Sequence, residues 1–411
     1  MHKAAQVEKS ATTCETWHAP LQPPPLRATL LGPDIEHRRS LEAMLDTRCA
    51  VSWMPDSSSF FRDRPVTLAR RLQRAFDQFG GTRDPAFRQA LLRHLDEHRT
   101  EVVVAYWGTN PLADLLAIRQ LRPGIRLVLM VLCYPLALDE LGVRRQHWML
   151  RRAAPHLDGV LFPSEAMRGH FQAHRLLQRA GREVADLVLP PCWPASFQPP
   201  LEADTPPAPA SSGPNLIFVG RTDLSHPTIH AADDLRGPMR ELLAQGIELH
   251  HVHSPETDDG HPLRRLFAPD SQTGLLARMA RHDASLILYN TAACERADRF
   301  DLTVPDRLIS SVAAGVPIAL PARGYRAAHD HLADHPAVIA FESFADLARQ
   351  LADRPRIAAM RQAAWQGRSR HAAEWQGPRL CRFLEELAPR PVPQPSRPAA
   401  TRRDSAREVV A

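Results

Sequence analysis

The sequence predicts an α/β protein made of two Rossmann-like, doubly wound domains that face a cleft. Short apolar runs rich in β-branched residues alternate with helical patterns along most of the 411 residues. This alternation is typical of parallel strands that are covered by helices on both faces. A single proline-rich stretch, 194–214, interrupts it, because its prolines and small polar residues can neither pair as a strand nor continue a helix. A chain of this length is also expected to form two or three domains of roughly 150 residues each.

The expected strands are the apolar runs between helical patterns. In the first half they are 28–31, 50–54, 101–106, 126–132, 159–162 and 186–189. In the second half they are 215–219, 247–252, 284–289, 317–320 and 337–340. Ligands of doubly wound sheets bind beyond the carboxyl ends of the strands, so the cleft between the two domains is the expected binding place.

The same patterns set the domain boundaries. We expect a first domain at 26–195, a linker at 196–214 and a second domain at 215–388. Residues 1–25 are polar and end in consecutive prolines, and residues 389–411 mix proline, arginine, serine and alanine without periodicity. Both of these segments are expected to be disordered.

Charge and residue usage exclude several classes of function. The net charge is only +5, and much of it lies in the tail 389–411, so nucleic acid is not an expected partner. Among the 51 basic residues only Lys3 and Lys9 are lysines, which excludes Walker-type phosphate loops and Schiff-base chemistry in the folded part. The six cysteines are scattered without a CxxC pair, as in proteins of the reducing cytosol. No apolar run is long enough to span a bilayer, so a cytoplasmic protein, at most peripheral at the inner membrane, is expected.

The most specific pattern lies in the second half. The segment NLIFVGR ends an expected strand with Gly220 and Arg221, where glycine allows close approach of the backbone and arginine can face a phosphate. The segment VPDRLISSVAAGVPIALP predicts a helix that begins near Pro305 and ends at Gly315. The N–H groups of such a helix start can hold a diphosphate. Arg307 in the first turn opposes the helix dipole and therefore calls for an anionic partner, unless it is an ordinary surface arginine.

Together with IELHHVHS, LLARMARHDASLILYN and FADLARQLAD, these segments resemble the donor domain of GT-B glycosyltransferases, with a C-terminal domain similar to that of family 4. The pattern P-x-[KR]-L-x-x-x-x-A-x-G-x-P is met by Pro305, Arg307, Leu308, Ala313, Gly315 and Pro317. The first half is similar to the acceptor domain in layout only. The resemblance implies transfer of a sugar from a nucleotide-diphosphate donor to a hydroxyl acceptor, as in bacterial surface polysaccharide or glycoconjugate synthesis. It also implies that neither a metal nor another cofactor takes part.

The resemblance places the donor contacts at the carboxyl edge of the second sheet. The candidate donor-binding residues are Gly220, Arg221, His226, Ser254, Asn290, Glu295, Asp301, Arg307 and Ser310. Glu295 and Asp301, with Asp298 between them, belong to an acidic loop that contacts donor sugar hydroxyls in the family, and a solvated loop is the alternative. His226 and His230 have the spacing of zinc ligands, but His226 precedes a proline and the HExxH glutamate is absent. The resemblance instead implies that His226 faces the cleft, and a structural histidine is the alternative.

Three places depart from the pattern of retaining members of the family. Leu302 and Ser310 stand where those enzymes carry glutamates, and 132–134 stands where they often have a histidine. A serine can make only one, weaker pairing with a ribose. These departures favour inversion, which needs a general base in the first domain. They also leave open a catalytically silent GT-B-like binding protein, or a nucleotide-sugar epimerase of the same fold.

The loop GPDIEH after the first expected strand offers the candidate catalytic residues Asp34 and His37, with Asp34 as the base. Asp139 and Glu140 are a second pair at the carboxyl edge of the first sheet. The alternative for Asp34 is a helix cap.

Segment 65–79 predicts an amphipathic helix. Its apolar face would carry Leu68, Leu72, Ala75, Phe76 and Phe79, and arginines 70, 71 and 74 would lie on another face. Such a helix can rest on anionic lipid, as expected if the acceptor is linked to a lipid. Alternatively, it covers the sheet with its apolar face.

Overall fold

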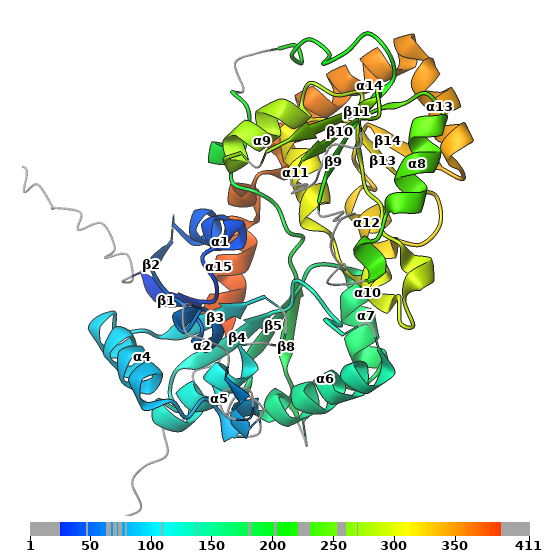
Figure 1. The fold of residues 1–411 in the computed structure, drawn as a ribbon. Helices are drawn as coiled ribbons and strands as arrows, with labels where there is room; N and C mark the ends of the chain where they lie inside the picture. The colour runs from blue at the N-terminus through cyan, green and yellow to red at the C-terminus, as the bar shows by residue number, and fades with distance from the viewer. Residues whose placement is uncertain are drawn as a thin grey trace, which may run out of the picture.

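The computed structural model describes residues 25–387 except for 47, 63–66, 69–71, 73–75, 79, 108, 110, 138, 180–181, 201–203, 221–230, 253–259 and 269. Figure 1 shows two α/β units, with the N-terminal unit below and the second unit above. The predicted disordered tail 389–411, and segment 1–25 apart from Pro25, lie outside the described residues.

The first domain contains a six-stranded parallel sheet in the order β2-β1-β3-β4-β5-β8. Its strands are β1 Leu26–Leu31, β2 Cys49–Met54, β3 Val102–Tyr106, β4 Arg126–Met130, β5 Gly159–Phe162 and β8 Ala185–Val188. Its helices are α1 Glu36–Leu45, α2 Ser57–Phe60, α4 Pro85–Glu97, α5 Leu112–Leu121, α6 Glu140–Ala153 and α7 Glu165–Ala173. A short antiparallel pair, β6 Gln178–Arg179 and β7 Arg182–Glu183, was not predicted.

The second domain repeats this design with the order β11-β10-β9-β12-β13-β14, again parallel throughout. Its strands are β9 Asn215–Val219, β10 Glu248–Val252, β11 Arg264–Phe267, β12 Ala284–Leu286, β13 Ile318–Pro321 and β14 Val338–Phe341. Its helices are α8 Arg236–Ala244, α9 Gln272–Met279, α10 Asp298–Leu302, α11 Asp306–Ala314, α12 Arg326–His331, α13 Phe344–Ala352 and α14 Arg354–Gly367. The final helix of the chain is α15 Gly377–Glu386.

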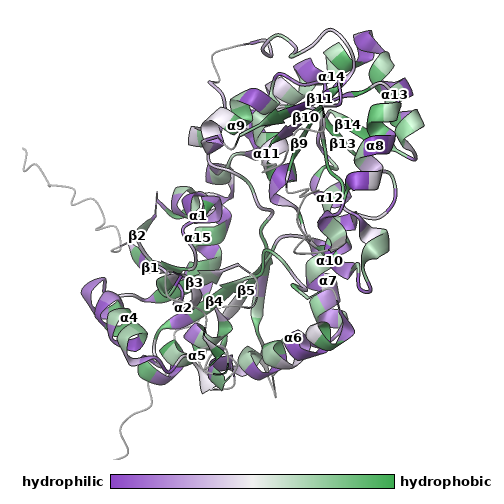
Figure 2. Ribbon diagram, viewed as in Figure 1, coloured by the Kyte–Doolittle hydropathy of each residue, from purple (hydrophilic) through white to green (hydrophobic). Residues whose placement is uncertain are grey.

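The predicted fold class is confirmed, and all eleven expected strands are present within a few residues. Most strands are hydrophobic along their length in Figure 2, whereas the helices alternate between hydrophobic and hydrophilic bands. This is the pattern of sheets that are covered on both faces. The edge strand β11 was missed because its sequence RRLF begins with two arginines rather than with an apolar run.

The last helix departs from the predicted domain division. The boundary at 388 assigned α15 to the second domain, but α15 packs against the first domain beside α1, as Figure 1 shows. Leu380 and Leu384 are fully buried in the same cluster as Leu30 and Met44. The sequence pattern shows that one face of a helix is apolar, but it does not show which sheet covers that face.

Two contacts hold α15 close to the first domain. Arg126 Nη1 donates to the backbone oxygen of Leu384 at 3.1 Å, and the thiols of Cys49 and Cys381 lie 4.0 Å apart as free cysteines. The second domain therefore ends before residue 377, and the chain returns to complete the first core.

The described part of the proline-rich linker contains no strand and only one short 3-10 turn, η2 Ala195–Phe197. It is tied to the second domain: Arg361 donates to the backbone oxygen of Pro207 at 2.7 Å, and the Ala210 amide donates to Arg281 at 2.7 Å. Among the described residues, no helix is both long and apolar enough to cross a membrane.

Candidate functional site

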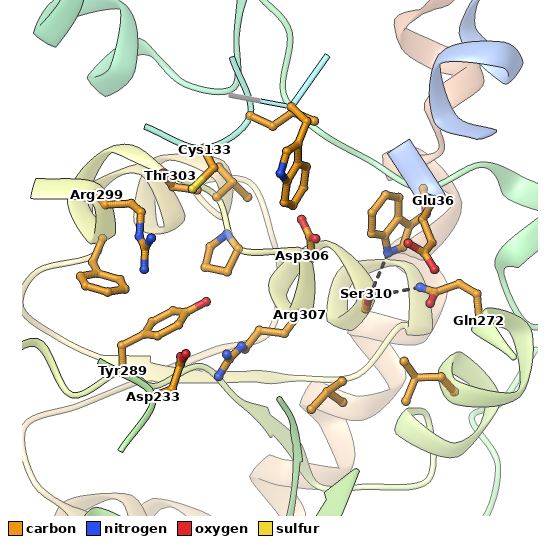
Figure 3. Close-up of a pocket in the computed structure, with 18 residues that line it drawn as sticks. Glu36, Cys133, Asp233, Gln272, Tyr289, Arg299, Thr303, Asp306, Arg307 and Ser310 are labelled. Carbon is orange, nitrogen blue, oxygen red and sulfur yellow. Dashed lines mark hydrogen bonds between the residues drawn. The ribbon is translucent and has the colours of Figure 1, made fainter. Parts of the chain in front are cut away.

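A pocket of about 450 Å³ opens between the domains, beyond the carboxyl ends of strands from both sheets. From the first domain it is lined by Glu36, Trp107, Leu132 and Cys133, and Trp193 follows from the segment that leads out of that domain. From the second domain it is lined mainly by Asp233, Gln272, Tyr289, Arg299, Thr303, Asp306, Arg307 and Ser310. In Figure 3 Tyr289, Asp233 and Arg299 lie on one side of the pocket, and Glu36 and Gln272 lie on the other, near Ser310.

Helix α11 begins at the floor of this pocket. Pro305 is its N-cap, and Gly315 ends it in the left-handed conformation with φ of 66°, as the motif predicts. Among the described residues no side chain caps the helix at Pro305. The Leu308 amide donates to the backbone oxygen of Pro305 at 2.9 Å, so the N–H groups of Asp306 and Arg307 are the ones that face an anion in the pocket.

Arg307 is held rigidly in the first turn of α11. Its guanidinium carbon lies 4.4 Å from the ring centre of Tyr289 and 4.7 Å from that of Phe218, and Nη1 donates to the backbone oxygen of Leu288 at 3.1 Å. A Cβ atom added to Gly220 would lie 2.9 Å from Arg307 Nη2, so only glycine leaves this side chain its place. Gly220 and Arg307, both expected at the carboxyl edge of the second sheet, are therefore neighbours in the structure. The two rings fix the guanidinium plane and leave further N–H donors for a ligand.

His37 joins the first domain to the start of α11. Its Nε2 lies 2.9 Å from Oδ1 of Asp306, and its ring packs 4.8 Å from Trp193 and 5.8 Å from Trp107. His37 is only 3% exposed and does not line the pocket, whereas the Asp306 side chain is 53% exposed and does. The histidine therefore orients a carboxylate that faces the pocket.

Ser310 is buried, and its hydroxyl oxygen accepts two hydrogen bonds. The indole Nε1 of Trp193 donates to Ser310 Oγ at 2.9 Å, and Gln272 Nε2 donates to the same oxygen at 3.2 Å, as the dashed lines in Figure 3 show. Leu302, at the other departure from the family pattern, is buried in the core, and its backbone oxygen accepts a hydrogen bond from Ser164 Oγ of the first domain. Neither position presents a carboxylate to the pocket.

Asp34, the expected base, lies outside this pocket. Its carboxylate is 3.3 Å from Arg38 Nη1, is 59% exposed, and borders a separate hollow. The alternative assignment as a helix cap is wrong, because Ile35 occupies the N-cap of α1 and no side chain of the described residues caps it. Glu36 of the same loop does line the pocket, and sequence reasoning missed it because an acid in the first turn of a helix is ordinary.

Asp139 and Glu140, the second acidic pair of the first domain, make structural contacts. Asp139 caps α6 by accepting from the amide of Gly142 at 2.7 Å. Glu140 bonds Arg296 of the second domain at 2.5 Å and Arg144 at 3.0 Å, and the Arg296 hydrogen bond lowers the pKa of Glu140. Neither residue lines the pocket.

Three other donor-binding candidates, Asn290, Glu295 and Asp301, do not line the pocket. Glu295 and Asp301 are exposed, and Asp301 accepts from the amide of Arg326 at 3.4 Å. Asn290 donates to the backbone oxygen of Asp234 at 3.0 Å, which holds the turn that carries Asp233. The candidates Arg221, His226 and Ser254 lie outside the described residues.

Several lining side chains were not singled out by the sequence analysis, among them Arg299, Trp107 and Trp193. Arg299 is the second cation of the pocket, and it donates to the backbone oxygen of Leu136 in the first domain at 3.3 Å. Trp107 and Trp193 form apolar walls. Cys133 also lines the pocket, and burial raises the pKa of its thiol. Within the described part of the chain no group of three or more side chains gathers that could hold a metal ion.

These features define a two-domain α/β architecture with two parallel sheets and a pocket between the domains. No family model and no curated protein match the chain. Solved structures do match it. Trehalose-6-phosphate synthase from E. coli, bound with UDP-2-fluoro glucose, has a TM-score of 0.59 at 13% identity, covering 89% of this chain and 100% of that chain. Another structure of this enzyme is described as addressing glycosyl transfer with retention.

Two further structures agree. Sucrose-phosphate synthase from Thermosynechococcus elongatus has a TM-score of 0.57 at 12% identity over 88% of this chain and 100% of that chain. HepE from Anabaena, in complex with UDP and glucose, has a TM-score of 0.53 at 11% identity over 88% of this chain and 100% of that chain. The chain therefore has the GT-B glycosyltransferase fold.

Proposed function

We propose that this protein is a glycosyltransferase that moves a sugar from a nucleotide-diphosphate donor to a hydroxyl acceptor. The observation that carries the proposal is the interdomain pocket in which the open start of α11 and the clamped guanidinium of Arg307 face side chains of the first domain. A helix start and a planar cation form a suitable site for a diphosphate. The fold that the chain shares with UDP-sugar-binding structures supports the same assignment.

In this proposal the diphosphate and the ribose of the donor bind in different parts of the pocket. The diphosphate lies against the start of α11 and Arg307, with Arg299 as a second cation. The ribose lies toward Ser310, whose hydroxyl still has its own proton to donate although its oxygen accepts from Trp193 and Gln272. No metal is needed, since the two arginines and the helix dipole offset the charge.

We further propose that Asp306, oriented by His37, is the general base. It adjoins Arg307, so it lies beside the diphosphate, where the bond to the sugar breaks. The carboxylate accepts the proton of the acceptor hydroxyl while that oxygen bonds to the anomeric carbon. The bond from this carbon to the diphosphate breaks, and its electron pair leaves with the diphosphate. A single displacement of this kind inverts the anomeric configuration.

Glu36 is the alternative base, but in Figure 3 it lies near Gln272 and Ser310, at the proposed nucleoside end. For the acceptor we propose a hydroxyl of a glycan or a lipid-linked sugar, of the kind used in bacterial surface polysaccharide or glycoconjugate synthesis. This choice depends on the family resemblance alone.

A second candidate function is a catalytically silent GT-B module that binds a nucleotide or a partner. The observation that favours it is the core position of Leu302 together with the two donors already bound to Ser310.

Calorimetric titration of the purified protein with UDP, GDP and ADP, followed by an assay for release of the nucleotide from each corresponding sugar nucleotide, distinguishes the two functions. The enzyme binds at least one nucleotide and releases it faster when an acceptor is added. A silent module binds without turnover, and binding of none of the three would refute the donor site.

A further inference from the structure

Helix α6 has an outward face on which large apolar side chains alternate with arginines. Leu141 is 79% exposed and Trp148 is 42% exposed, and because they are seven residues apart they lie on the same side of the helix. Arg145 follows Leu141 by four residues, and Arg152 follows Trp148 by four residues, so both arginines lie on this same side of the helix. The opposite side is the buried one, with Val143, Met149, Leu150 and Ala153. The apolar and hydrophilic bands of α6 alternate along the helix in Figure 2.

A second set of exposed apolar side chains adjoins this face. Leu68, Leu72 and Phe76 are 73%, 53% and 63% exposed, and their spacing of four residues places them on one side of the segment. Arg145 Nη2 donates to Gln78 Oε1 at 2.5 Å, so the end of this segment lies against α6. The alternative in which this apolar face covers the sheet is wrong for these three side chains.

Exposed large apolar side chains are concentrated in the first domain. Among the described residues, the exposed large apolar side chains all fall between positions 60 and 148 of the first domain, with the exception of Trp375. Exposed apolar groups that gather in this way mark an interaction surface rather than chance exposure.

The charge of this face is positive. Arg145 bonds the neutral amide of Gln78, and Arg151 donates to the backbone oxygen of His174 at 2.8 Å, so neither charge is offset by these contacts. The acid at the start of the helix, Glu140, is shared between Arg144 and Arg296. A partner of complementary chemistry must therefore offer anions beside an apolar layer.

We propose that the outward face of α6, together with Leu68, Leu72 and Phe76, docks the first domain on an anionic lipid surface. Arginines bind the phosphates of the headgroups, while indole, phenyl and leucine side chains enter the boundary with the acyl chains. A nucleic acid would supply the anionic phosphates, but it has no apolar layer into which the leucine side chains could insert. This inference does not depend on the proposed glycosyl transfer, since docking is measured without a donor.

The test is flotation of the full chain with vesicles of phosphatidylcholine, alone or mixed with phosphatidylglycerol, at low and high salt. Two double variants probe the face: Leu141→Gln with Trp148→Gln, and Arg145→Gln with Arg152→Gln. Their matched controls are Trp375→Gln and Arg323→Gln, at positions that are 72% and 90% exposed away from α6. Circular dichroism of all four variants is the check that each remains folded.

We expect the protein to bind only the vesicles that contain phosphatidylglycerol, and more weakly at high salt. Each α6 variant should lower the partition coefficient by about tenfold or more, and each control should bind like the unmodified protein. Three results would overturn the proposal. The first is absence of binding, and the second is unchanged binding of both α6 variants, which would assign docking to another part such as the tail 389–411. The third is loss of self-association in the variants without vesicle binding, which would assign the face to a second copy of the chain.

Discussion

His37 and Asp306 belong to opposite domains, and their side chains lie 2.9 Å apart at the start of α11, beside the interdomain pocket. They are separated by 269 positions in the chain, yet one hydrogen bond joins the start of α1 to the start of α11. His37 is enclosed by Trp107 and Trp193, whereas the carboxylate of Asp306 reaches the pocket. The contact therefore ties the orientation of a pocket carboxylate to the position of the first domain.

Replacing Asp306 with Asn tests its assignment as the base. The amide keeps the shape and can still accept a hydrogen bond from His37, but it cannot take a proton. We expect kcat to fall by about a hundredfold or more, with donor affinity near that of the unmodified protein. The matched variants are Asp34→Asn and Glu36→Gln, whose rates should stay near the unmodified value. A large loss in either of them, with Asp306→Asn active, would move the base to that residue.

Replacing Arg307 with Ala separates diphosphate binding from nucleoside binding. The guanidinium can hold two phosphate oxygens, so its loss should weaken UDP binding by about tenfold or more and leave uridine binding unchanged. Calorimetry with both ligands measures the difference, and Arg323→Ala, at an exposed position of the same domain, is the control. Equal losses for UDP and uridine would show that Arg307 supports the structure of the pocket instead.

The fold was accessible from the sequence because buried parallel strands are local signals. Runs such as 102–106 and 215–219 are almost wholly buried, and their apolar character needs no partner to be recognised. The helix from Pro305 to Gly315 was also readable, since proline and glycine act on the backbone where they stand. In contrast, the docking of α15 on the first sheet depends on long-range packing that leaves no local pattern.

The site was only partly accessible for the same reason. Local patterns singled out Gly220, Arg307 and Ser310; in the structure Gly220 lies against Arg307, and Arg307 and Ser310 line the pocket. Trp193, Gln272 and Arg299 contribute through contacts between distant segments, and no spacing in the chain marks such contacts. Asp34 and Glu36 show the limit most clearly, because Asp34 precedes α1 and pairs with Arg38, whereas Glu36, two positions later, begins α1 and lines the pocket.

The bond between Trp193 and Ser310 should contribute to stability. Ser310→Ala removes an acceptor and leaves the buried indole N–H of Trp193 without this partner, which should lower the free energy of unfolding by about 1–3 kcal/mol. Adding Trp193→Phe should cost less than the sum of the two single changes, because the unsatisfied donor is then gone. Urea denaturation of all four proteins measures the coupling, and strict additivity would contradict it.

Because α15 packs against the first domain, a change that weakens this packing should destabilise the first domain more than the second. Leu384→Ala opens a cavity in the first core and should destabilise the protein by about 2–5 kcal/mol, while Arg379→Ala on the exposed side of α15 should have little effect. Hydrogen exchange locates the effect: amides of β1 and β3 should exchange faster, and those of β9 and β12 should keep their protection. Faster exchange in the second sheet alone would contradict the packing of α15.

Buried histidines predict that the protein loses stability in mild acid. Burial lowers the pKa of His282 to about 3 and that of His335 to about 4, whereas an unfolded histidine titrates near 6.5. Between these values the unfolded chain binds a proton at each position that the folded chain does not, so stability falls as the pH decreases from about 6.5 toward 4. Each histidine should add about 1.4 kcal/mol per pH unit to the slope.

His335→Asn tests this assignment. The Asn oxygen can replace Nδ1 of His335 as the acceptor for the amide of Ala337, 3.3 Å away, but it does not titrate. Urea denaturation at a series of pH values should therefore show a slope that is about 1.4 kcal/mol per pH unit shallower than that of the unmodified protein, with similar stability at neutral pH. An identical slope in both proteins would mean that His335 takes up its proton in the folded state as readily as in the unfolded one.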